Sequence, residues 1–329
     1  MESNDYYLPD HFCIIVASHI SNPNRIPYLV ECLESLLHQT IPVTVYLSIS
    51  FAAKDLREAG LSALGRSFTP NMQSGGLVVL VRDQKTPQMR HIDLTLGAMK
   101  PTDEWILFCD DDDTYAPTRV AKFAELIVSC LRTKLGGGQM VAGAYETRFG
   151  KNHRDNRQEY WCYCVHRTVI ERFYAGVRPY PLVLEDKCCD VLFGEFLRRL
   201  GPGYLFATLD EHGYNYRVEN NSDSVTGVIR TNQSRYMNIT MSNPPDIGDS
   251  AWADYVIEWN DYLHENLMVY IHDVYLRTLL GMSFEDILVA EFKGNRPILD
   301  FVDDCHSARL REHFDLVRRV CGEIYDIKI

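Results

Sequence analysis

Four consecutive aspartates, Asp110 to Asp113, follow the apolar run Trp105–Cys109 and precede a helical pattern that starts near Pro117. The apolar run predicts a buried strand, and the proline favours a helix N-terminus. The four carboxylates therefore stand where a core strand ends, and they repel one another unless a cation or a ligand neutralises them. Hard oxygen ligands of this kind suit Mg²⁺ or Mn²⁺. A solvated acidic turn is the alternative, but open α/β sheets bind ligands at such strand ends.

A second acidic pair, Glu185 and Asp186, opens the helical pattern of Leu184–Leu200, and Asp190 follows one turn later. Acids in the first turn of a helix interact favourably with the helix dipole. Charge complementation is therefore a purely structural explanation for this pair.

The elements that must position these acids alternate between strand and helix. Before the aspartates, apolar runs predict strands and 3.6-residue periodicity predicts helices, in the order Phe12–Ala17 (strand), Tyr28–His38 (helix), Val43–Ile49 (strand), Lys54–Leu64 (helix), Leu77–Val81 (strand) and Arg90–Met99 (helix). After them we expect the helix Thr118–Thr133, the strands Met140–Tyr145 and Tyr160–Val165, the helix Thr168–Tyr174, and the strands Tyr204–Thr208 and Tyr214–Val218. Successive strand–helix–strand units make a parallel sheet.

Composition changes near residue 230. Residues 230–250 are polar and contain Pro244 and Pro245, which indicates a linker or long loop, and residues 251–329 are mostly helical in pattern. We therefore expect an α/β domain over residues 1–229. Residues 230–329 would form a helical C-terminal region, which could also mediate a homodimer.

Bulk composition excludes several classes of protein. The 329 residues are 46% hydrophobic, enough for a substantial core, and the net charge of −12 argues against binding the phosphate backbone of nucleic acids. The ten cysteines show no paired CxxC spacing, which argues against zinc and disulfide scaffolds. The N-terminus lacks a secretory apolar region, and no apolar stretch reaches about 18 residues. We therefore expect a soluble cytoplasmic protein without a membrane span.

Several segments in a fixed order carry a resemblance to a known family. They are VASHISNPNRIPYLVECLESLLHQTIPVTVYLSIS, the pair Arg90-His91, FCDDDDTYAPTRV, Trp161–Ile170, LEDKCCDVLFGEFLRRLG and YNYRVENNSDSVT. The chain resembles inverting glycosyltransferases of the family-2 type over roughly residues 10–227. The resemblance implies the GT-A fold, a Rossmann-like and mostly parallel sheet flanked by helices. It makes residues 1–229 the catalytic domain, with a donor-binding half at about 10–135 and an acceptor half at about 136–229.

The resemblance also assigns roles to the acids. Asp112 would be the direct ligand of Mn²⁺ or Mg²⁺, with Asp110 and Asp111 facing the metal or the ribose of a nucleotide-sugar donor. Asp186 would be the general base that activates the acceptor hydroxyl, supported by Glu185, with Asp190 as second candidate.

Further residues are assigned less directly. Ser18, Arg25, Ser48 and Arg90 occupy positions that resemble nucleotide-proximal ones, although either arginine could instead form a surface salt bridge. Trp161 could stack on an acceptor sugar or belong to the core. His212 and Glu219 are candidates for a third metal ligand, although a lone histidine is more often structural.

The sequence departs from the family where the second strand ends. The family usually has aspartates there that read the nucleotide base, whereas this chain has Leu47 to Ser50 and no acid. UDP-sugar is therefore only the default donor, with GDP- and dTDP-sugars as alternatives. The partners expected are a nucleotide sugar and a glycan acceptor.

Two other functions are compatible with parts of the pattern. A nucleotidyltransferase acting on sugar phosphates shares an α/β sheet with metal-binding acids, but it would normally carry a Gly-rich basic loop after the first strand, which Ser18–Pro27 lacks. A non-catalytic sugar-binding protein could keep the fold without turnover, and the intact acidic motifs argue against it.

Overall fold

The computed structural model describes residues 12–133, 139–147, 158–217, 245–261, 281–286 and 304–325. Its contacts divide the chain into two compact units, Met1–Arg217 and Val218–Ile329, which are described separately. The expected boundary near residue 229 falls outside the described residues, so that boundary stays a prediction.

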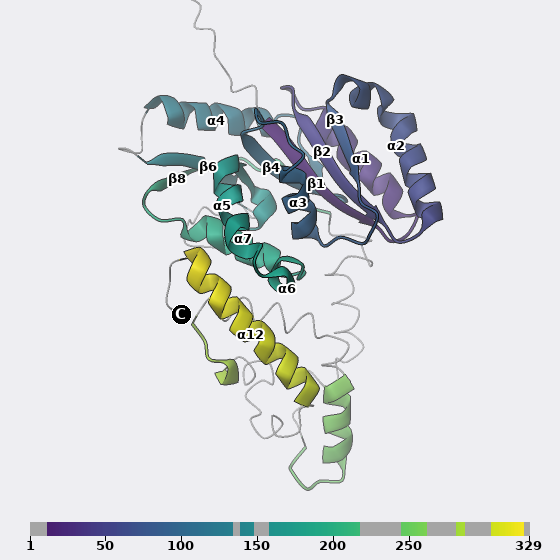
Figure 1. The fold of residues 1–329 in the computed structure, drawn as a ribbon, viewed down its shortest axis with the longest axis vertical. Coiled ribbons are helices and arrows are strands. Elements are labelled where there is room, and N and C mark those ends of the chain that lie inside the picture. Colours follow the sequence, from purple (N-terminus) through teal and green to yellow (C-terminus); the bar gives the residue numbers. More distant parts are fainter. Residues whose placement is uncertain are drawn as a thin grey trace, which may run out of the picture. The chain divides into compact units, whose positions relative to one another are not determined.

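The first unit is built on a sheet whose described strands lie in the order β3-β2-β1-β4-β7-β6-β8 (Figure 1). Their bounds are β1 (Phe12–Ile20), β2 (Thr44–Phe51), β3 (Leu77–Val81), β4 (Trp105–Asp110), β6 (Met140–Glu146), β7 (Tyr163–His166) and β8 (Tyr204–Leu209). Strand β7 runs antiparallel to β4 and β6, and the other neighbours are parallel. The expected α/β class with a mostly parallel sheet is confirmed. Two short strands, β5 (Thr114–Tyr115) and β9 (Tyr214–Asn215), pair separately.

Helices cover both faces of this sheet (Figure 1). They are α1 (Arg25–Leu37), α2 (Lys54–Ser74), α3 (Gln88–Leu96), α4 (Arg119–Thr133), α5 (Arg167–Val177), α6 (Pro181–Leu184) and α7 (Cys189–Arg199). Because crossovers between parallel strands are right-handed, α1 and α2 lie on one face as the chain moves from β1 outward to β3. The chain then returns past β1 to β4, which places α3 on the other face.

The apolar runs form the strands because both faces of the sheet are covered. Ile14, Val16, Leu47 and Ile106 are fully buried, one or two from each of the central strands. Strands that are buried on both faces are continuous in hydrophobicity, which is the pattern that the sequence shows.

Four predicted elements differ from those observed. The predicted strand Tyr160–Val165 begins as a 3₁₀ turn over Tyr160–Cys162, because the Cys162 N–H donates to Glu159 O at 2.9 Å. The predicted helix Leu184–Leu200 is broken between α6 and α7. The predicted strand Tyr214–Val218 is described only as β9. Helix α2 extends ten residues beyond its predicted end at Leu64 and is kinked at Phe68, shortly before a proline.

The described parts of the second unit are helical, as expected. Residues 251–261 form one helix, and α12 (Asp304–Tyr325) forms another. Phe284 packs against Phe314 with ring centroids 5.6 Å apart, and the Arg311 guanidinium lies 4.1 Å from the Phe284 ring. Much of the region expected to be helical, residues 251–329, lies outside the described residues. Across the described part of both units, no helix is long and apolar enough to cross a bilayer.

A buried ion pair ties the start of α4 to the end of β6. Arg119 and Glu146 have fully buried side chains and approach to 2.8 Å. The second oxygen of Glu146 accepts the Gly213 N–H at 2.9 Å, and a Cβ at Gly213 would lie 2.8 Å from Arg119 Cγ. Arg119 also donates to Trp161 O at 2.9 Å. This pair therefore fixes the loop that leads into β9.

Glu146→Ala should destabilise the first unit by about 3–5 kcal/mol, because it leaves the Arg119 charge buried without its partner. Urea unfolding followed by circular dichroism measures the loss. Glu211→Ala is the matched control, since Glu211 pairs with Lys122 at the surface and should cost less than about 1 kcal/mol. Equal unfolding midpoints for the two variants would contradict a structural role for the buried pair.

Candidate active site

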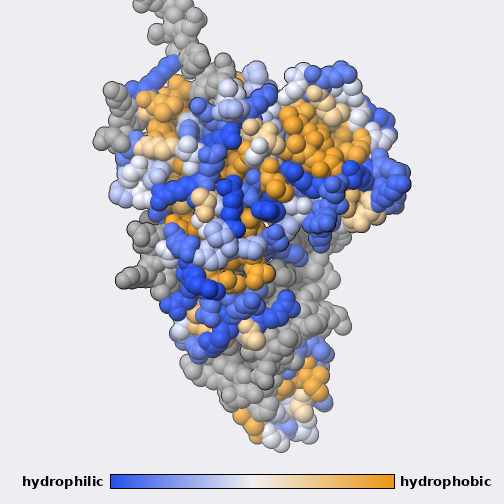
Figure 2. Space-filling model, in the orientation of Figure 1, coloured by the Kyte–Doolittle hydropathy of each residue, from blue (hydrophilic) through white to orange (hydrophobic). Residues whose placement is uncertain are grey.

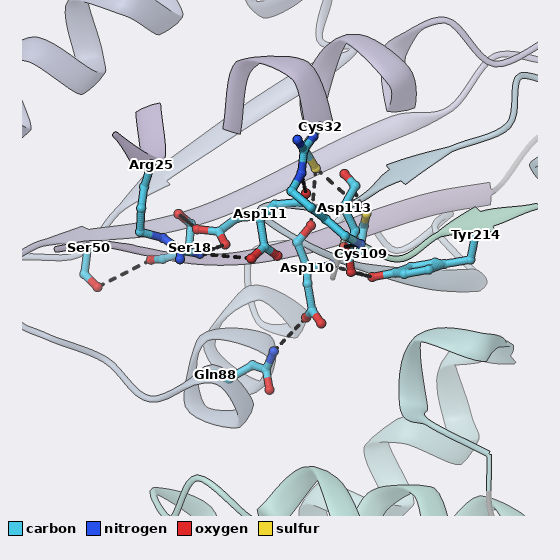
Figure 3. Close-up of polar contacts among 12 residues, drawn as sticks. Ser18, Arg25, Cys32, Ser50, Gln88, Cys109, Asp110, Asp111, Asp113 and Tyr214 are labelled. Atoms are coloured by element: carbon cyan, nitrogen blue, oxygen red, sulfur yellow. Dashed lines mark hydrogen bonds and ion pairs between the residues drawn. The ribbon is translucent and has the colours of Figure 1, made fainter. Parts of the chain in front are cut away.

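The acidic turn, Asp110 to Asp113, begins at the carboxyl end of β4, where the strand order reverses. The chain runs from β1 outward through β2 and β3 and then returns to place β4 on the other side of β1. Such a reversal opens a crevice between the two strand ends, which is where open α/β sheets bind ligands. The two sides are joined here, because the Ser18 hydroxyl at the end of β1 donates to Asp111 Oδ2 at 2.6 Å (Figure 3).

Asp111 and Asp112 face the N-terminal end of α1. Arg25, the first residue of α1, donates from Nη2 to Asp111 Oδ1 at 2.5 Å and lies 3.7 Å from Asp112 Oδ2. The Asp112 side chain is 12% exposed and that of Arg25 is 14% exposed. The predicted donor-side residues Ser18, Arg25 and Asp111 therefore meet at one point, and Asp112 lies beside them.

Asp110 is held by two side chains that the sequence did not single out. The hydroxyl of Tyr160 donates to Asp110 Oδ1, and Gln88 Nε2 donates to the same oxygen at 2.8 Å. Gln88 also donates to the Tyr160 hydroxyl at 2.7 Å. These three side chains form a closed triangle that fixes the Asp110 carboxyl group.

Asp113 turns away from the strand end and serves the architecture of the turn. It accepts the Tyr214 hydroxyl at 2.7 Å and the backbone N–H of Arg217 at 2.6 Å. Tyr214 also accepts the N–H of Asp110 at 3.1 Å, and the Arg217 side chain donates to Asp112 O at 2.8 Å. The segment around β9 therefore clamps the acidic turn from a position about a hundred residues later in the chain.

Two buried thiols lie beside the turn (Figure 3). Cys32 of α1 donates to Asp110 O at 3.5 Å, and Cys109 donates to Asp113 O at 3.8 Å. The described cysteines are free and buried, as expected for core thiols.

The turn holds more negative charge than its neighbours neutralise. Burial raises the pKa of Asp110 well above its usual range, and the nearby Asp113 charge adds to this effect. Burial also raises the pKa of Asp111, although the Arg25 charge opposes this shift. For Asp113, burial raises the pKa to about 7. Arg217 directs its terminal nitrogen to Glu31 at 2.6 Å, not to these carboxyl groups.

A divalent cation fits this turn in charge and in donor chemistry. Mg²⁺ is usually held by one or two carboxylates together with substrate phosphates and water. Within the described ranges, no three His, Cys, Asp or Glu side chains are placed to hold an ion together. His212 is exposed on the loop before β9, and Glu219 lies outside the described residues. The aspartates of the turn are therefore the first candidates to hold such an ion.

Three other predicted residues contact protein groups. Arg90 pairs with Asp93 on its own helix at 2.8 Å. Ser48 is fully buried and bonds to protein groups. Trp161 is 5% exposed, and its ring stacks on that of Tyr214 with centroids 4.1 Å apart. Its ring thus packs on the tyrosine that supports the acidic turn.

The acids predicted to lie in the first turn of one long helix lie elsewhere. Glu185 is the C-cap residue of α6 and is exposed, and Asp186 follows in the turn between α6 and α7. Asp186 Oδ1 accepts the N–H of Cys188 at 2.8 Å, a local bond that competes with helix continuation. Only Asp190 lies in a first helical turn, that of α7.

Helix α7 packs against the strand that carries the acidic turn. Phe193 of α7 meets Phe108 of β4 edge to face, with centroids 5.7 Å apart. Asp190 precedes Phe193 by three residues, so the two lie on the same side of α7. The Asp190 charge also adds to the burial and Asp110 effects that raise the pKa of Tyr160. Asp190 is thus held near β4 by the packing of α7 on that strand.

The sequence alone did not single out four residues that contact the acidic turn, namely Gln88, Tyr160, Tyr214 and Arg217. Tyr214 and Arg217 belong to the segment YNYRV that carries part of the resemblance, so that segment was the available signal. Nothing local marks Gln88 or Tyr160, because their partner lies 22 or 50 residues away.

Comparison with known protein families gives a match over part of the chain. Residues 13–161 match the family described as Glycosyl transferase family 2. No curated protein sequence matches the chain.

Solved structures with weak likeness include TarS of S. aureus and a mannosyltransferase of Pyrobaculum calidifontis. TarS of S. aureus, residues 1–349 with UDP, is 12% identical, with a TM-score of 0.41, over 96% of this chain and 90% of that one. Mannosyltransferase PcManGT from Pyrobaculum calidifontis, with GDP-Man and Mn²⁺, is 12% identical, with a TM-score of 0.41, over 95% and 87%. Against a longer TarS structure (11% identical, TM-score 0.41, 96% of this chain), the chain spans 55% of that protein's length.

Tyr214→Phe should lower the free energy of unfolding by about 1–3 kcal/mol, because it leaves buried groups of Asp110 and Asp113 without their shared partner. Urea denaturation measures the loss. Tyr204→Phe is the control, because the Tyr204 hydroxyl bonds only to Arg172 at the surface among the contacts described. If both variants unfold at the wild-type urea concentration, the clamp on the acidic turn is not a stabilising feature.

Proposed function

We propose that this chain is a family-2 glycosyltransferase with the GT-A fold, because residues 13–161 match the family described as Glycosyl transferase family 2. It transfers a sugar from a nucleoside-diphosphate sugar to a hydroxyl group of a glycan or another acceptor, with inversion at the anomeric carbon. The observation that carries the proposal is the buried acidic turn at the strand-order reversal, bonded across to β1. A UDP-sugar is the default donor, and GDP- and dTDP-sugars are the alternatives.

The donor's diphosphate would lie against the acidic turn. Asp112 and Asp110 would hold Mn²⁺ or Mg²⁺, with His212 as a further candidate ligand. When bound, the ion offsets the negative charge that grows on the leaving diphosphate. Tyr160 and Gln88 fix the Asp110 carboxyl group, and Arg25 can offset further diphosphate charge.

Asp186 would act as the general base. It takes the proton of the acceptor hydroxyl while the acceptor oxygen bonds to the anomeric carbon and the bond to the diphosphate breaks. Asp190 is the second candidate for this role, and the exposed Glu185 could contact the acceptor. Support comes from α7, whose Phe193 contact with Phe108 ties this acidic segment to β4.

Asp112→Asn should weaken Mn²⁺ binding at least about tenfold. Removing a residue that only supports a metal ligand already lowers metal affinity by about this factor, and removing the ligand itself should lower it at least as much. Isothermal titration with Mn²⁺ in the presence of UDP measures the affinity. Asp83→Asn is the control, because Asp83 pairs with Arg57 at the surface. Wild-type affinity in Asp112→Asn would remove Asp112 from the metal site.

The proposed reaction is tested with UDP-, GDP- and dTDP-sugars, Mn²⁺, and water as a slow acceptor. Proton NMR should show release of nucleoside diphosphate and, first, the sugar anomer opposite to that of the donor. Asp186→Asn should lower turnover by about 10²–10⁴-fold while donor binding stays unchanged. Asp190→Asn is the paired variant, and the larger loss identifies the base.

Three results would contradict the proposal. Release of the retained anomer would exclude inversion. Release of pyrophosphate from a nucleoside triphosphate and a sugar phosphate would indicate the nucleotidyltransferase alternative. Binding of sugars without any turnover would indicate the non-catalytic alternative.

A further inference from the structure

A polar network crosses the carboxyl ends of β1, β2 and β3, at the place where an acid was expected. The Ser48 hydroxyl lies 2.8 Å from His91 Nδ1 and accepts from Arg82 Nε at 2.9 Å. The Ser50 hydroxyl lies 3.3 Å from His91 Nε2. Each hydroxyl at the end of β2 therefore engages one nitrogen of the same buried ring.

The network continues to the acidic turn. The Ser50 hydroxyl donates to Ser18 O at 3.5 Å, and the Ser18 hydroxyl donates to Asp111 (Figure 3). The strand register places Ser48 opposite Ala17, and Ala17 opposite Asp110. Ser48 and the start of the turn therefore lie in one row across the sheet, two strand spacings or about 10 Å apart.

Arg82 supplies a buried donor that the protein leaves unused. Its Nη2 is buried and has no hydrogen-bond partner in the described part of the chain. The neighbouring Asp83 pairs with Arg57 at 3.3 Å. A buried donor without a partner is costly, and a guanidinium keeps its charge, so this nitrogen requires an acceptor oxygen from elsewhere.

The rest of the network adds little charge that could replace Arg82. Burial lowers the pKa of His91 to about 4, and the Arg82 charge contributes to this shift, so His91 is neutral at pH 7. Both of its ring nitrogens are engaged by serine hydroxyls. The network therefore holds Arg82 in place through its Nε, and its Nη2 stays available as a donor.

The position of Arg82 identifies the part of the ligand that it meets. If the diphosphate lies at the acidic turn, as proposed above, the far end of an extended nucleotide reaches across β1 toward β2. That end is the nucleobase, whose acceptor oxygens are carbonyls. Uracil, thymine, cytosine and guanine carry a carbonyl oxygen, whereas adenine carries none.

We infer that Arg82 is the specificity-determining residue for the donor nucleotide, and that its Nη2 donates to a carbonyl oxygen of the base. The inference rests on the proposed function for the location of the diphosphate. The carboxylate expected at this place would accept a hydrogen bond from the base. In this chain the Arg82 cation would instead donate a hydrogen bond to the base.

The test compares four ligands by isothermal titration with Mn²⁺ present: UDP, GDP, ADP and inorganic pyrophosphate. Wild-type protein should bind UDP or GDP more tightly than ADP. Arg82→Met should weaken binding of the preferred nucleotide by about 10- to 100-fold and leave ADP and pyrophosphate unchanged. Arg82→Lys, which keeps a cationic donor, should lose less. Arg57→Met is the matched control and should bind as wild type does.

The outcomes separate the inference from the proposed function. An equal loss of pyrophosphate affinity in Arg82→Met would show a phosphate contact and overturn the inference, as would equal wild-type affinity for all three nucleotides. Unchanged nucleotide binding in Arg82→Met overturns it as well. Failure of the wild-type protein to bind any of the four ligands would instead refute the proposed function. Thermal melting checks the fold of each variant, and Arg82→Lys decides the question if Arg82→Met does not fold.

Discussion

The burial of four adjacent carboxyl groups at the end of a central strand is the constraint on which the rest of the first unit depends. Each group lacks most of the water that would stabilise its charge, so each needs a partner from elsewhere in the fold. Helix α1 supplies Arg25, α3 supplies Gln88, the turn before β7 supplies Tyr160, and the segment around β9 supplies Tyr214. The site is therefore the meeting point of elements that are far apart in sequence.

A second layer of buried charge supports the first. Arg119 and Glu146 pair completely out of contact with water, and Glu146 also holds the backbone of Gly213 immediately before Tyr214. Because breaking such a pair leaves an uncompensated charge, the position of β9 is strongly defined. The Arg119–Glu146 pair thus fixes the loop before β9, and the Tyr214 hydroxyl in β9 contacts the acidic turn.

The sequence predicted the elements whose cause is local. Apolar runs such as Trp105–Cys109 are strands because they are buried on both faces, and the aspartates after them mark the strand end. It did not predict the break between α6 and α7, since Leu184–Leu200 has a continuous helical pattern and the break depends on the Asp186 side chain bonding to Cys188. Nor could it predict Tyr160 or Gln88, because their importance comes from a partner that only the folded sheet brings near. The roles of Asp186, Asp112 and Arg90 in catalysis and binding stay predictions.

The reversed direction of β7 has a consequence for how this protein could diversify. Because β7 is antiparallel to β4 and β6, the connection from Glu146 to Tyr160 starts and ends at the same edge of the sheet as the acidic turn. The connection from β8 to β9 starts at that edge too, since β8 is parallel to β6. Substitutions and insertions in these two connections can therefore reshape one side of the site while β1 to β4 stay unchanged. The topology thus lets selection alter one side of the acidic turn independently of the strands that carry the other side.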